Sequence, residues 1–240
     1  MNSPHDSWAQ VYDEVYRRSF GGFLKTLTDA TLECVKGKIP APARIVDYGA
    51  GTGRLALPLA RAGYQVTAVE PSAEMLSVLK SRAEACGLDI TCQNCRMQDT
   101  FDAEPFDFAT CVFTVISYLP DEEALTASLT NAARSLKIGG RLLIDVPQRR
   151  LFRSNRWSEK DFDRKVDVTQ VLPDIYDYDE KGRIQFEGRM VDYADRFRIR
   201  CWDPSVVTRI LSDAGMEIEE DQSPVFQIAA ANYYLATRNR

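Results

Sequence analysis

Hydrophobic positions at the N-terminus follow helical spacing. Apolar residues recur every three or four positions: Trp8, Val11, Tyr12, Val15 and Tyr16, then Phe20, Phe23, Leu24 and Leu27. Charged residues such as Asp13 and Arg17 fall between them, which is typical of amphipathic helices. Pro40 and Pro42 end the pattern. We therefore expect residues 1–43 to be a helical N-terminal section.

From Arg44 onward, short apolar runs alternate with helical segments. The predicted strands are 45–46, 65–69, 90–95, 108–113 and 141–146, and the predicted helices are 55–62, 72–85, 121–136 and 204–214. Ser72 is placed to cap its helix, which stops at Gly87. This alternation predicts a parallel sheet with helices on both faces. Two closing strands, 216–220 and 228–237, are joined by a short loop and must be antiparallel.

Residues 147–202 follow a different pattern, without a convincing long helix. Residues 183–191 and 196–202 have strand character, and a turn is predicted at 180–182. We interpret the segment as an antiparallel β insertion. The fold class is therefore α/β, with a Rossmann-like core made of residues 44–146 and 203–240.

Composition narrows the choice of partners. The chain has 240 residues, a net charge of −5 and a pI of about 5.1, which disfavours nucleic acid as a partner. No apolar run approaches the ~20 residues that cross a bilayer, and residues 1–7 lack the order of a secretory signal. We expect a cytoplasmic protein that contacts neither membrane nor nucleic acid.

Cysteine and histidine usage restricts the chemistry further. The six cysteines are scattered as buried thiols would be, and the Cys92–Cys95 pair lacks the further ligands of a zinc site, so no metal is expected. The single histidine, His5, lies in a segment that we expect to be disordered. Hydrolases that need a well-placed imidazole are therefore disfavoured.

A glycine-rich loop lies between the first core strand and its helix. Its sequence is Asp47-Tyr48-Gly49-Ala50-Gly51-Thr52-Gly53, and Glu70 follows 17 residues beyond Gly53 at the end of the next strand. Glycine permits a tight turn and close approach of a ligand to the backbone, while a carboxylate in this place accepts both hydroxyls of a ribose. The pattern predicts a nucleotide-type ligand.

Charge favours one kind of nucleotide. The spacing is GxGxG and not the GxGxxG of dinucleotide enzymes, and Asp47 stands at the mouth of the loop. A carboxylate would repel the pyrophosphate of NAD but attract the ammonium and sulfonium of S-adenosylmethionine (SAM). We therefore expect SAM as cofactor and S-adenosylhomocysteine as product.

Residues 45–60 and 66–76 resemble the first two motifs of class I SAM-dependent methyltransferases, and a looser match extends over residues 8–146 and 203–237. The resemblance implies a seven-stranded sheet, an N-terminal helical lid and an insertion over the active site. It also implies the ligand contacts. The glycine loop would hold the methionine part, Glu70 the ribose, and Pro71 and Met75 the adenine, with Phe113 also beside the cofactor.

One motif departs from the family. Where relatives often carry Asp-Met after the third strand, this chain has Arg96-Met97. The Met97 backbone and the Asp99 carboxylate are the candidates for adenine recognition. A protein that has lost SAM binding therefore stays open as an alternative.

Candidate acceptor contacts are Tyr12, Tyr16, Tyr118 and Asp145. Tyr118 and Asp145 follow core strands, where ligands of such sheets bind. Plain packing of the tyrosines and loop capping by Asp145 are the alternatives. The alternating Arg196, Arg198 and Arg200 favour a solvated strand face over an anion site.

Three functions compete at this point. A methyltransferase acting on N or O of a small-molecule acceptor leads, with architecture similar to glycine and amino-sugar N-methyltransferases. An NAD(P)-dependent oxidoreductase and an inactive SAM-binding scaffold are the alternatives. The insertion's aromatic residues suit a closed pocket or a homodimer interface equally.

Overall fold

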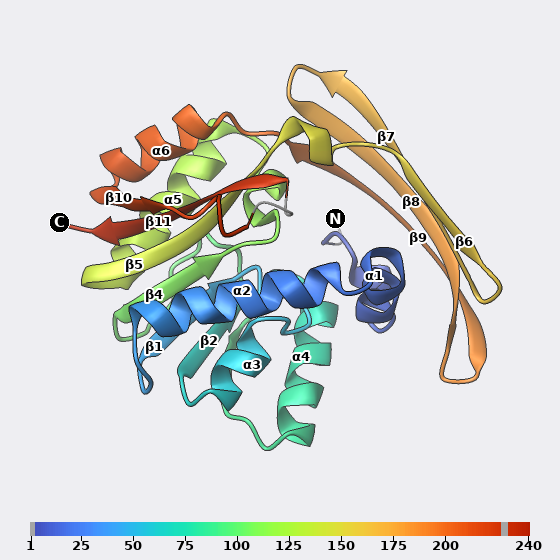
Figure 1. The fold of residues 1–240 in the computed structure, drawn as a ribbon, viewed down its shortest axis with the longest axis horizontal. Coiled ribbons are helices and arrows are strands. Elements are labelled where there is room, and N and C mark those ends of the chain that lie inside the picture. The colour runs from blue at the N-terminus through green and yellow to red at the C-terminus, as the bar shows by residue number, and fades with distance from the viewer. Residues whose placement is uncertain (1–2, 227–229) are drawn as a thin grey trace.

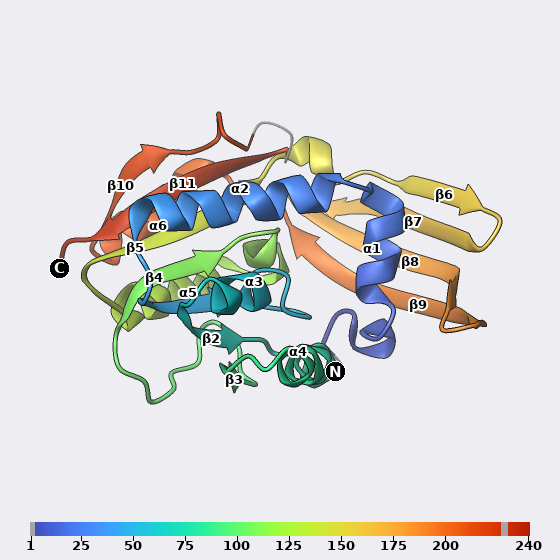
Figure 2. The ribbon, with the colours of Figure 1, turned by 60° about the horizontal axis from the view of Figure 1, so that its bottom comes forward.

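The computed structural model describes residues 3–226 and 230–240 and contains two β-sheets. A seven-stranded sheet with helices on both sides makes the larger body, and a long curved four-stranded sheet lies beside it (Figure 1). The N-terminal helix Tyr12–Phe20 lies between the two sheets, whereas the next helix, Phe23–Lys38, runs along the seven-stranded sheet (Figures 1 and 2). The predicted fold class is confirmed.

The large sheet has the strand order β10-β11-β5-β4-β1-β2-β3. Its strands are β1 (Arg44–Tyr48), β2 (Gln65–Val69), β3 (Ile90–Gln93), β4 (Phe106–Cys111), β5 (Leu136–Pro147), β10 (Met216–Asp221) and β11 (Ala231–Arg238). The first five are parallel, while β11 is antiparallel to both β5 and β10, as expected. The predicted last strand began at residue 228, and its positions 228–229 lie outside the described residues.

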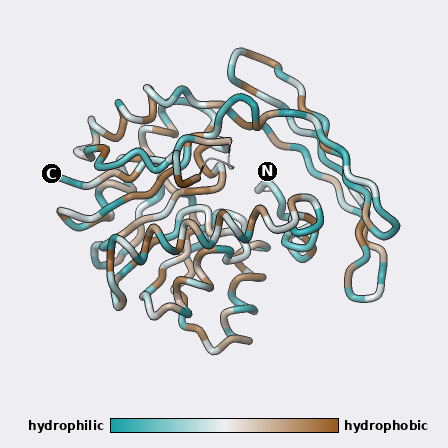
Figure 3. The backbone as a smooth tube through the Cα atoms, in the orientation of Figure 1, coloured by the Kyte–Doolittle hydropathy of each residue, from teal (hydrophilic) through white to brown (hydrophobic). Residues whose placement is uncertain are grey.

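The helices that cover this sheet are α2 (Phe23–Lys38), α3 (Ala56–Arg61), α4 (Ala73–Ala85), α5 (Glu122–Ser135) and α6 (Pro204–Asp213). Side-chain caps begin three of them. Ser72, Asp121 and Asp203 each accept a backbone N–H of the first turn, which explains why these helices begin where the sequence predicted. β1, β2 and β4 are almost wholly buried, and hydrophobic positions concentrate there (Figure 3).

The N-terminal section forms a short 3-10 turn, η1 (Asp6–Trp8), followed by α1 (Tyr12–Phe20) and α2 (Phe23–Lys38). Two further 3-10 turns, η2 (Val115–Tyr118) and η3 (Arg149–Leu151), follow β4 and β5. Among residues 3–226 and 230–240, no helix has the length and hydropathy needed to cross a membrane. The cytoplasmic location stays a prediction.

The insertion is antiparallel, as predicted, but two of its strands were missed and one turn was misplaced. It contains β6 (Asn155–Glu159), β7 (Phe162–Leu172), β8 (Ile175–Phe186) and β9 (Arg189–Arg200) in sequential order. The predicted turn at 180–182 is wrong, because these residues pair with β7 and β9 in the middle of β8. The predicted strand 183–191 is wrong as well. The chain turns within it, at Glu187 and Gly188, which both have positive φ as a tight hairpin turn requires.

Tertiary contacts explain why the turn-like residues are extended. Glu180 forms a buried, two-bonded ion pair with Arg164 of β7, at 2.8 and 3.1 Å. Gly182 lies where Tyr193 of β9 crosses it, and a Cβ there would come within 2.6 Å of the tyrosine ring and of the Asp163 carbonyl. Gly182 therefore allows the strands to pack closely and Glu180 pairs across them, so neither residue ends the strand.

Candidate active site

The glycine loop connects β1 to α3 at the carboxyl edge of the sheet. Gly49, Gly51 and Gly53 all have positive φ, of 69°, 54° and 94°. A side chain at Gly49 would collide with Val115, and one at Gly53 would press against Leu57 and Leu79. A Cβ on Gly51 would meet nothing within 4 Å. The loop therefore packs on one side and presents Gly51 to open space, as a ligand-approaching loop does.

Glu70 follows β2 and reaches across to this loop. Its Oε2 accepts the Gly51 N–H at 2.9 Å and its Oε1 accepts the Ser72 N–H at 2.8 Å. The residue is 8% exposed, and burial raises the pKa of the carboxyl, which the two N–H donors oppose. Since a carboxylate can accept about four hydrogen bonds, acceptor capacity remains for two hydroxyls of a ribose.

Asp47 lies at the end of β1, is 3% exposed and accepts a 2.6 Å hydrogen bond from Thr110 of β4. Burial raises the pKa of Asp47 to about 6, against the opposing effects of Thr110 and of the Arg54 guanidinium. Arg54, which sequence reasoning did not single out, lies 4.7 Å above the Phe113 ring and donates to Thr28 at 2.9 Å.

These residues fit a cationic nucleoside. Asp47 and Glu70 are buried carboxylates whose ionised forms would be favoured by a nearby positive charge, and Gly51 leaves room beside them. The adenosyl and methionine assignments of the individual residues remain predictions.

The predicted adenine contacts lie beside β3 and α4. Pro71 is exposed, whereas Met75 is buried against Ala9 of the N-terminal segment. Asn94, which the sequence did not indicate, donates to the Glu70 carbonyl at 3.0 Å and to the Pro71 carbonyl at 3.1 Å, so it fixes this edge.

The Arg96–Asp99 segment forms a turn. The Asp99 carboxylate accepts the Arg96 N–H at 2.8 Å, and both side chains are exposed. The Met97 side chain is buried in the core, and its carbonyl accepts a bond from Asn131 at 2.8 Å. Asp99 therefore lies at the surface of the expected adenine edge, and its role there stays a prediction.

Asp145 holds the loop after β4. Both of its oxygens accept the Thr114 N–H, at 3.1 and 3.0 Å, and Phe113 and Thr114 have strained positive φ values of 73° and 67°. Asp145 is buried, and desolvation raises its pKa to about 7. The loop-capping alternative is thus what the geometry shows, and an acceptor contact stays a prediction.

Tyr16 lies beside this loop and stacks on Tyr12, while Tyr118 follows the loop in η2. Tyr12 and Tyr16 stack with ring centroids 4.4 Å apart, and Tyr16 lies 6.0 Å from Phe113. Burial raises the pKa of Tyr12 and of Tyr118 well above the ordinary value, and each is also raised by charge on a neighbouring tyrosine. The structure therefore brings α1 and η2 together over the carboxyl ends of β1, β4 and β5.

The expectation for His5 was wrong. His5 is 7% exposed, and its Nε2 lies 2.9 Å from Tyr118 Oη. Its backbone N–H donates to Asp195 Oδ2 at 2.6 Å. An isolated histidine among polar residues carries no periodic signal, so sequence reasoning could not place it.

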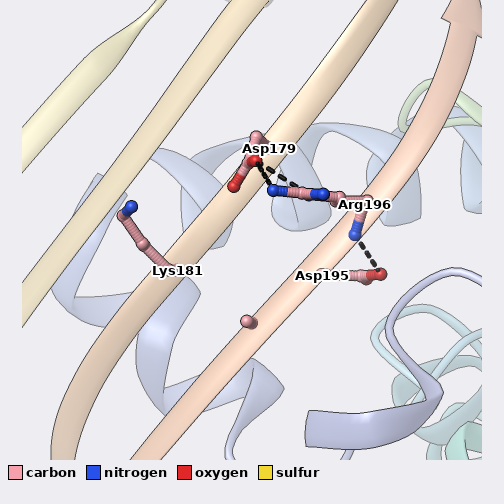
Figure 4. Close-up of a pocket in the computed structure, with 5 residues that line it drawn as sticks. Asp179, Lys181, Asp195 and Arg196 are labelled. Atoms are coloured by element: carbon pink, nitrogen blue, oxygen red, sulfur yellow. Dashed lines mark hydrogen bonds and ion pairs between the residues drawn. The ribbon is translucent and has the colours of Figure 1, made fainter.

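The arginine ladder of β9 faces outward. Arg196 pairs with Asp179 (Figure 4) and Arg198 pairs with Asp177; both arginines are exposed and both aspartates are half-buried. Arg200 donates to the Pro120 carbonyl at 3.1 Å. This agrees with the solvated-face interpretation. The insertion's aromatics, by contrast, pack inward: Trp157, Phe186 and Tyr193 with α1, Tyr176 and Tyr178 with Phe152 and Phe197, and Trp202 with the core.

The two cysteines of the CxxC, Cys92 and Cys95, are free and partly buried, and burial raises the pKa of both thiols. Within the described ranges, no group of three or more His, Cys, Asp or Glu side chains has the arrangement of a metal site.

Comparisons with known proteins agree with this geometry. Residues 45–140 match the family model described as methyltransferase domain. The ubiquinone biosynthesis O-methyltransferase of Xanthomonas axonopodis pv. citri is 33% identical over 132 residues, 52% of each chain. The chain spans about half the length of the curated relatives that it matches.

Solved structures match over nearly the whole chain. An S-adenosylmethionine-dependent methyltransferase from Clostridium acetobutylicum has a TM-score of 0.84 at 17% identity and covers 98% of this chain and 99% of its own. The sugar N-methyltransferase KedS8 from Streptoalloteichus sp. has a TM-score of 0.78 at 19% identity. The match covers 96% of this chain and 93% of KedS8. Residues 45–140 therefore match a methyltransferase domain, and the chain as a whole shares the fold of these solved methyltransferases.

Proposed function

We propose that this protein transfers the methyl group of SAM to a small-molecule acceptor. The observation that supports this most directly is the pair of buried carboxylates, Asp47 and Glu70, beside a glycine loop with open space at Gly51. Such a site attracts a cationic nucleoside and repels a pyrophosphate. The same charge disfavours the oxidoreductase alternative.

Most of the activation in this reaction comes from the sulfonium, which supplies an electrophilic methyl carbon when SAM is bound. The protein's own residues bind, orient and exclude water. Asp47 and Glu70 would hold the donor, while Asp145 fixes the Phe113–Thr114 turn between donor and acceptor sides. Tyr12, Tyr16 and Tyr118 would line the acceptor side, covered by α1 and the insertion.

We infer an acceptor with a nucleophilic nitrogen, and oxygen as the second candidate. The sugar N-methyltransferase shares the fold over 96% of this chain. The O-methyltransferase relative matches only about half of the chain. The aromatic walls also suit an amine, since a cation is stabilised by aromatic faces. Self-association into a homodimer stays a prediction.

Calorimetry with SAM, S-adenosylhomocysteine and NADH tests the donor. Both adenosyl ligands should bind and NADH should not. Protein that binds NADH alone would be an oxidoreductase. Protein that binds none of the three would support the scaffold alternative. Methyl-labelled SAM with glucosamine, glycine and catechol then tests the acceptor class, and label transfer to catechol alone would favour oxygen.

A further inference from the structure

His5 is buried among aromatic side chains at the start of the chain. Its ring contacts Trp8, Tyr12 and Phe197, with centroids 5.2, 5.4 and 5.0 Å away. Its backbone has φ 71°, a conformation that a non-glycine residue rarely adopts. The 3-10 turn that follows contacts both α4 and β9. The N-terminal segment therefore delivers one imidazole to the acceptor side at a cost in backbone strain.

Two side chains lie against the two ring nitrogens. Nε2 is 2.9 Å from Tyr118 Oη, while Nδ1 is 3.2 Å from Asp195 Oδ2. The latter pair is close but out of line, and Nδ1 is buried without a hydrogen-bond partner among residues 3–226 and 230–240. Asp195 also accepts the His5 N–H at 2.6 Å and the Trp8 indole N–H at 3.2 Å, so its carboxylate is fixed. Asp195 belongs to β9, and its other oxygen, Oδ1, accepts the backbone N–H of Arg196 (Figure 4).

Tyr118 connects this pair to the candidate acceptor side. It follows β4 in η2. Charge on Tyr16 raises the pKa of Tyr118, and charge on Tyr118 raises the pKa of Tyr12, so the three phenols are neighbours. The order from the site outward is therefore tyrosine hydroxyl, imidazole, carboxylate. A carboxylate beside Nδ1 favours a proton on that nitrogen and leaves Nε2 free to accept one.

We propose that Tyr118, His5 and Asp195 form a proton-relay chain that takes up the proton released by the methyl acceptor. This rests on the proposed methyl transfer. The acceptor lone pair forms the new bond to the methyl carbon, and the carbon–sulfur bond breaks with its electrons left on sulfur. The acceptor's proton passes to Tyr118 Oη while the phenolic proton of Tyr118 passes to His5 Nε2. Tyr118 stays neutral, and the imidazolium is stabilised by Asp195.

The other acidic groups near the site have hydrogen-bond partners of their own. Asp145 uses both oxygens on the Thr114 N–H, Glu70 accepts two backbone N–H groups, and Asp6 bonds to Ser72. Tyr118 and Tyr12 have pKa values raised by burial, so neither phenol gives up its proton without a partner that takes it. The charged groups near His5 are Asp195 on β9, Glu70 after β2 and Asp6 on its own segment, and all three are acidic. In this scheme Tyr118 is the catalytic residue and His5 is a positioning residue.

Nitrogen NMR of the whole protein tests the chain of contacts without any acceptor. His5 is the only histidine, so ¹⁵N-histidine labelling gives a single imidazole. In the neutral form we expect a protonated Nδ1 and an unprotonated Nε2. Tyr118→Phe should move the Nε2 signal, and Asp195→Asn should shift the tautomer balance. Ser7→Ala, which removes a neighbouring bond from the segment to the Ala194 carbonyl, should leave both signals unchanged. A neutral imidazole protonated at Nε2, or signals insensitive to Tyr118→Phe, would overturn the proposal.

Kinetics separates a relay from simple packing. The substrate is whichever of glucosamine, glycine and catechol the wild type methylates. With it, His5→Gln should lower kcat by roughly 10–100-fold and leave KM unchanged. The shape of its pH–rate profile should also differ from that of the wild type, because the imidazole no longer takes up the proton. A packing role would instead raise KM at every pH and leave the profile's shape intact, which contradicts the proposal. If the wild type binds no SAM, the proposed function fails, and the NMR result remains a separate fact about His5.

Discussion

The Gly51 N–H and Glu70 Oε2 are joined by a 2.9 Å hydrogen bond that ties the glycine loop after β1 to the end of β2. The same carboxylate accepts the Ser72 N–H at the start of α4. One side chain thus sets the spacing of three elements around the expected ribose position. A strand-end carboxylate would ordinarily contribute little to stability, but this one stabilises the site's own backbone.

Glu70→Ala should weaken SAM binding by about 1–3 kcal/mol, because two ribose hydroxyls lose a charged acceptor. The structure adds a second effect. The partly buried Gly51 N–H and the buried Ser72 N–H lose their partner, so the free energy of unfolding should fall by roughly 1–3 kcal/mol as well. Calorimetry and urea unfolding measure the two effects separately.

Glu70→Gln is the matched control. It keeps the side-chain length and one acceptor oxygen, so it should lose less stability than Glu70→Ala while still losing SAM affinity. Full affinity in a folded Glu70→Ala protein would place the ribose elsewhere.

SAM affinity should fall as the pH drops below about 6, because the pKa of Asp47 is about 6 and its ionised form attracts the cation. Asp47→Asn should bind SAM more weakly above pH 6 and should lose this pH dependence. Thr110→Val is the control, since the Thr110 hydrogen bond lowers the pKa of Asp47 and its removal should move the affinity loss to higher pH. Affinity that ignores pH in the wild type would exclude Asp47 as the contact.

Asp145→Asn should change how stability depends on pH. The pKa of Asp145 is about 7 in the folded protein against 3.8 ordinarily, so the folded state binds more protons between these values. The wild-type free energy of unfolding therefore gains a contribution as pH falls from about 7 to about 4. Asparagine carries no such charge, so the variant should be relatively more stable above pH 7.

That relative advantage should shrink as the pH falls from about 7 to about 4, because in this range Asp145 takes up its proton in the folded state and stays largely ionised in the unfolded state. Urea unfolding of the two proteins across this range measures it. A stability difference that stays constant with pH would mean that Asp145 titrates normally.

If Asp99 accepts the adenine amino group, Asp99→Ala should weaken SAM binding more than Arg96→Ala. An unpaired buried donor costs about 1–3 kcal/mol, whereas an exposed arginine should cost little. The Asp99 carboxylate already accepts the Arg96 N–H, so Asp99→Asn, which keeps that bond, is the control for turn integrity. The reverse order of effects would assign the adenine contact to Arg96.

The core was predictable because its signals are local. Helix caps at Ser72, Asp121 and Asp203, glycines with positive φ, and alternating apolar runs each act within a few residues. The Asp47 and Glu70 positions followed from the loop sequence alone. Side-chain partners such as Thr110 for Asp47 are 63 residues away, and no local pattern indicates them.

The insertion and the N-terminal turn were harder because their order depends on distant contacts. β6 and β7 are rich in charged residues, and Arg164 becomes buried only because Glu180, Tyr16 and Trp157 surround its guanidinium. His5 is ordered by Asp195, which lies 190 residues further along the chain. In both places a polar residue that suggests solvent or disorder is held in place by a partner that the sequence does not indicate.

Gly182→Ala provides a sharp test of the register of β8. The added methyl group would lie 2.6 Å from the Asp163 carbonyl and from the Tyr193 ring, so we expect a loss of about 1–3 kcal/mol in the free energy of unfolding. Gly37→Ala is the matched control, because a Cβ there meets nothing within 4 Å inside α2, and it should stabilise the protein by roughly 0.5–1 kcal/mol. Urea unfolding of both variants measures the contrast. If residues 180–182 formed the turn that their composition suggests, Gly182 would face open space and its substitution would be harmless. A neutral Gly182→Ala would therefore contradict the continuous β8 strand and the Tyr193 contact together.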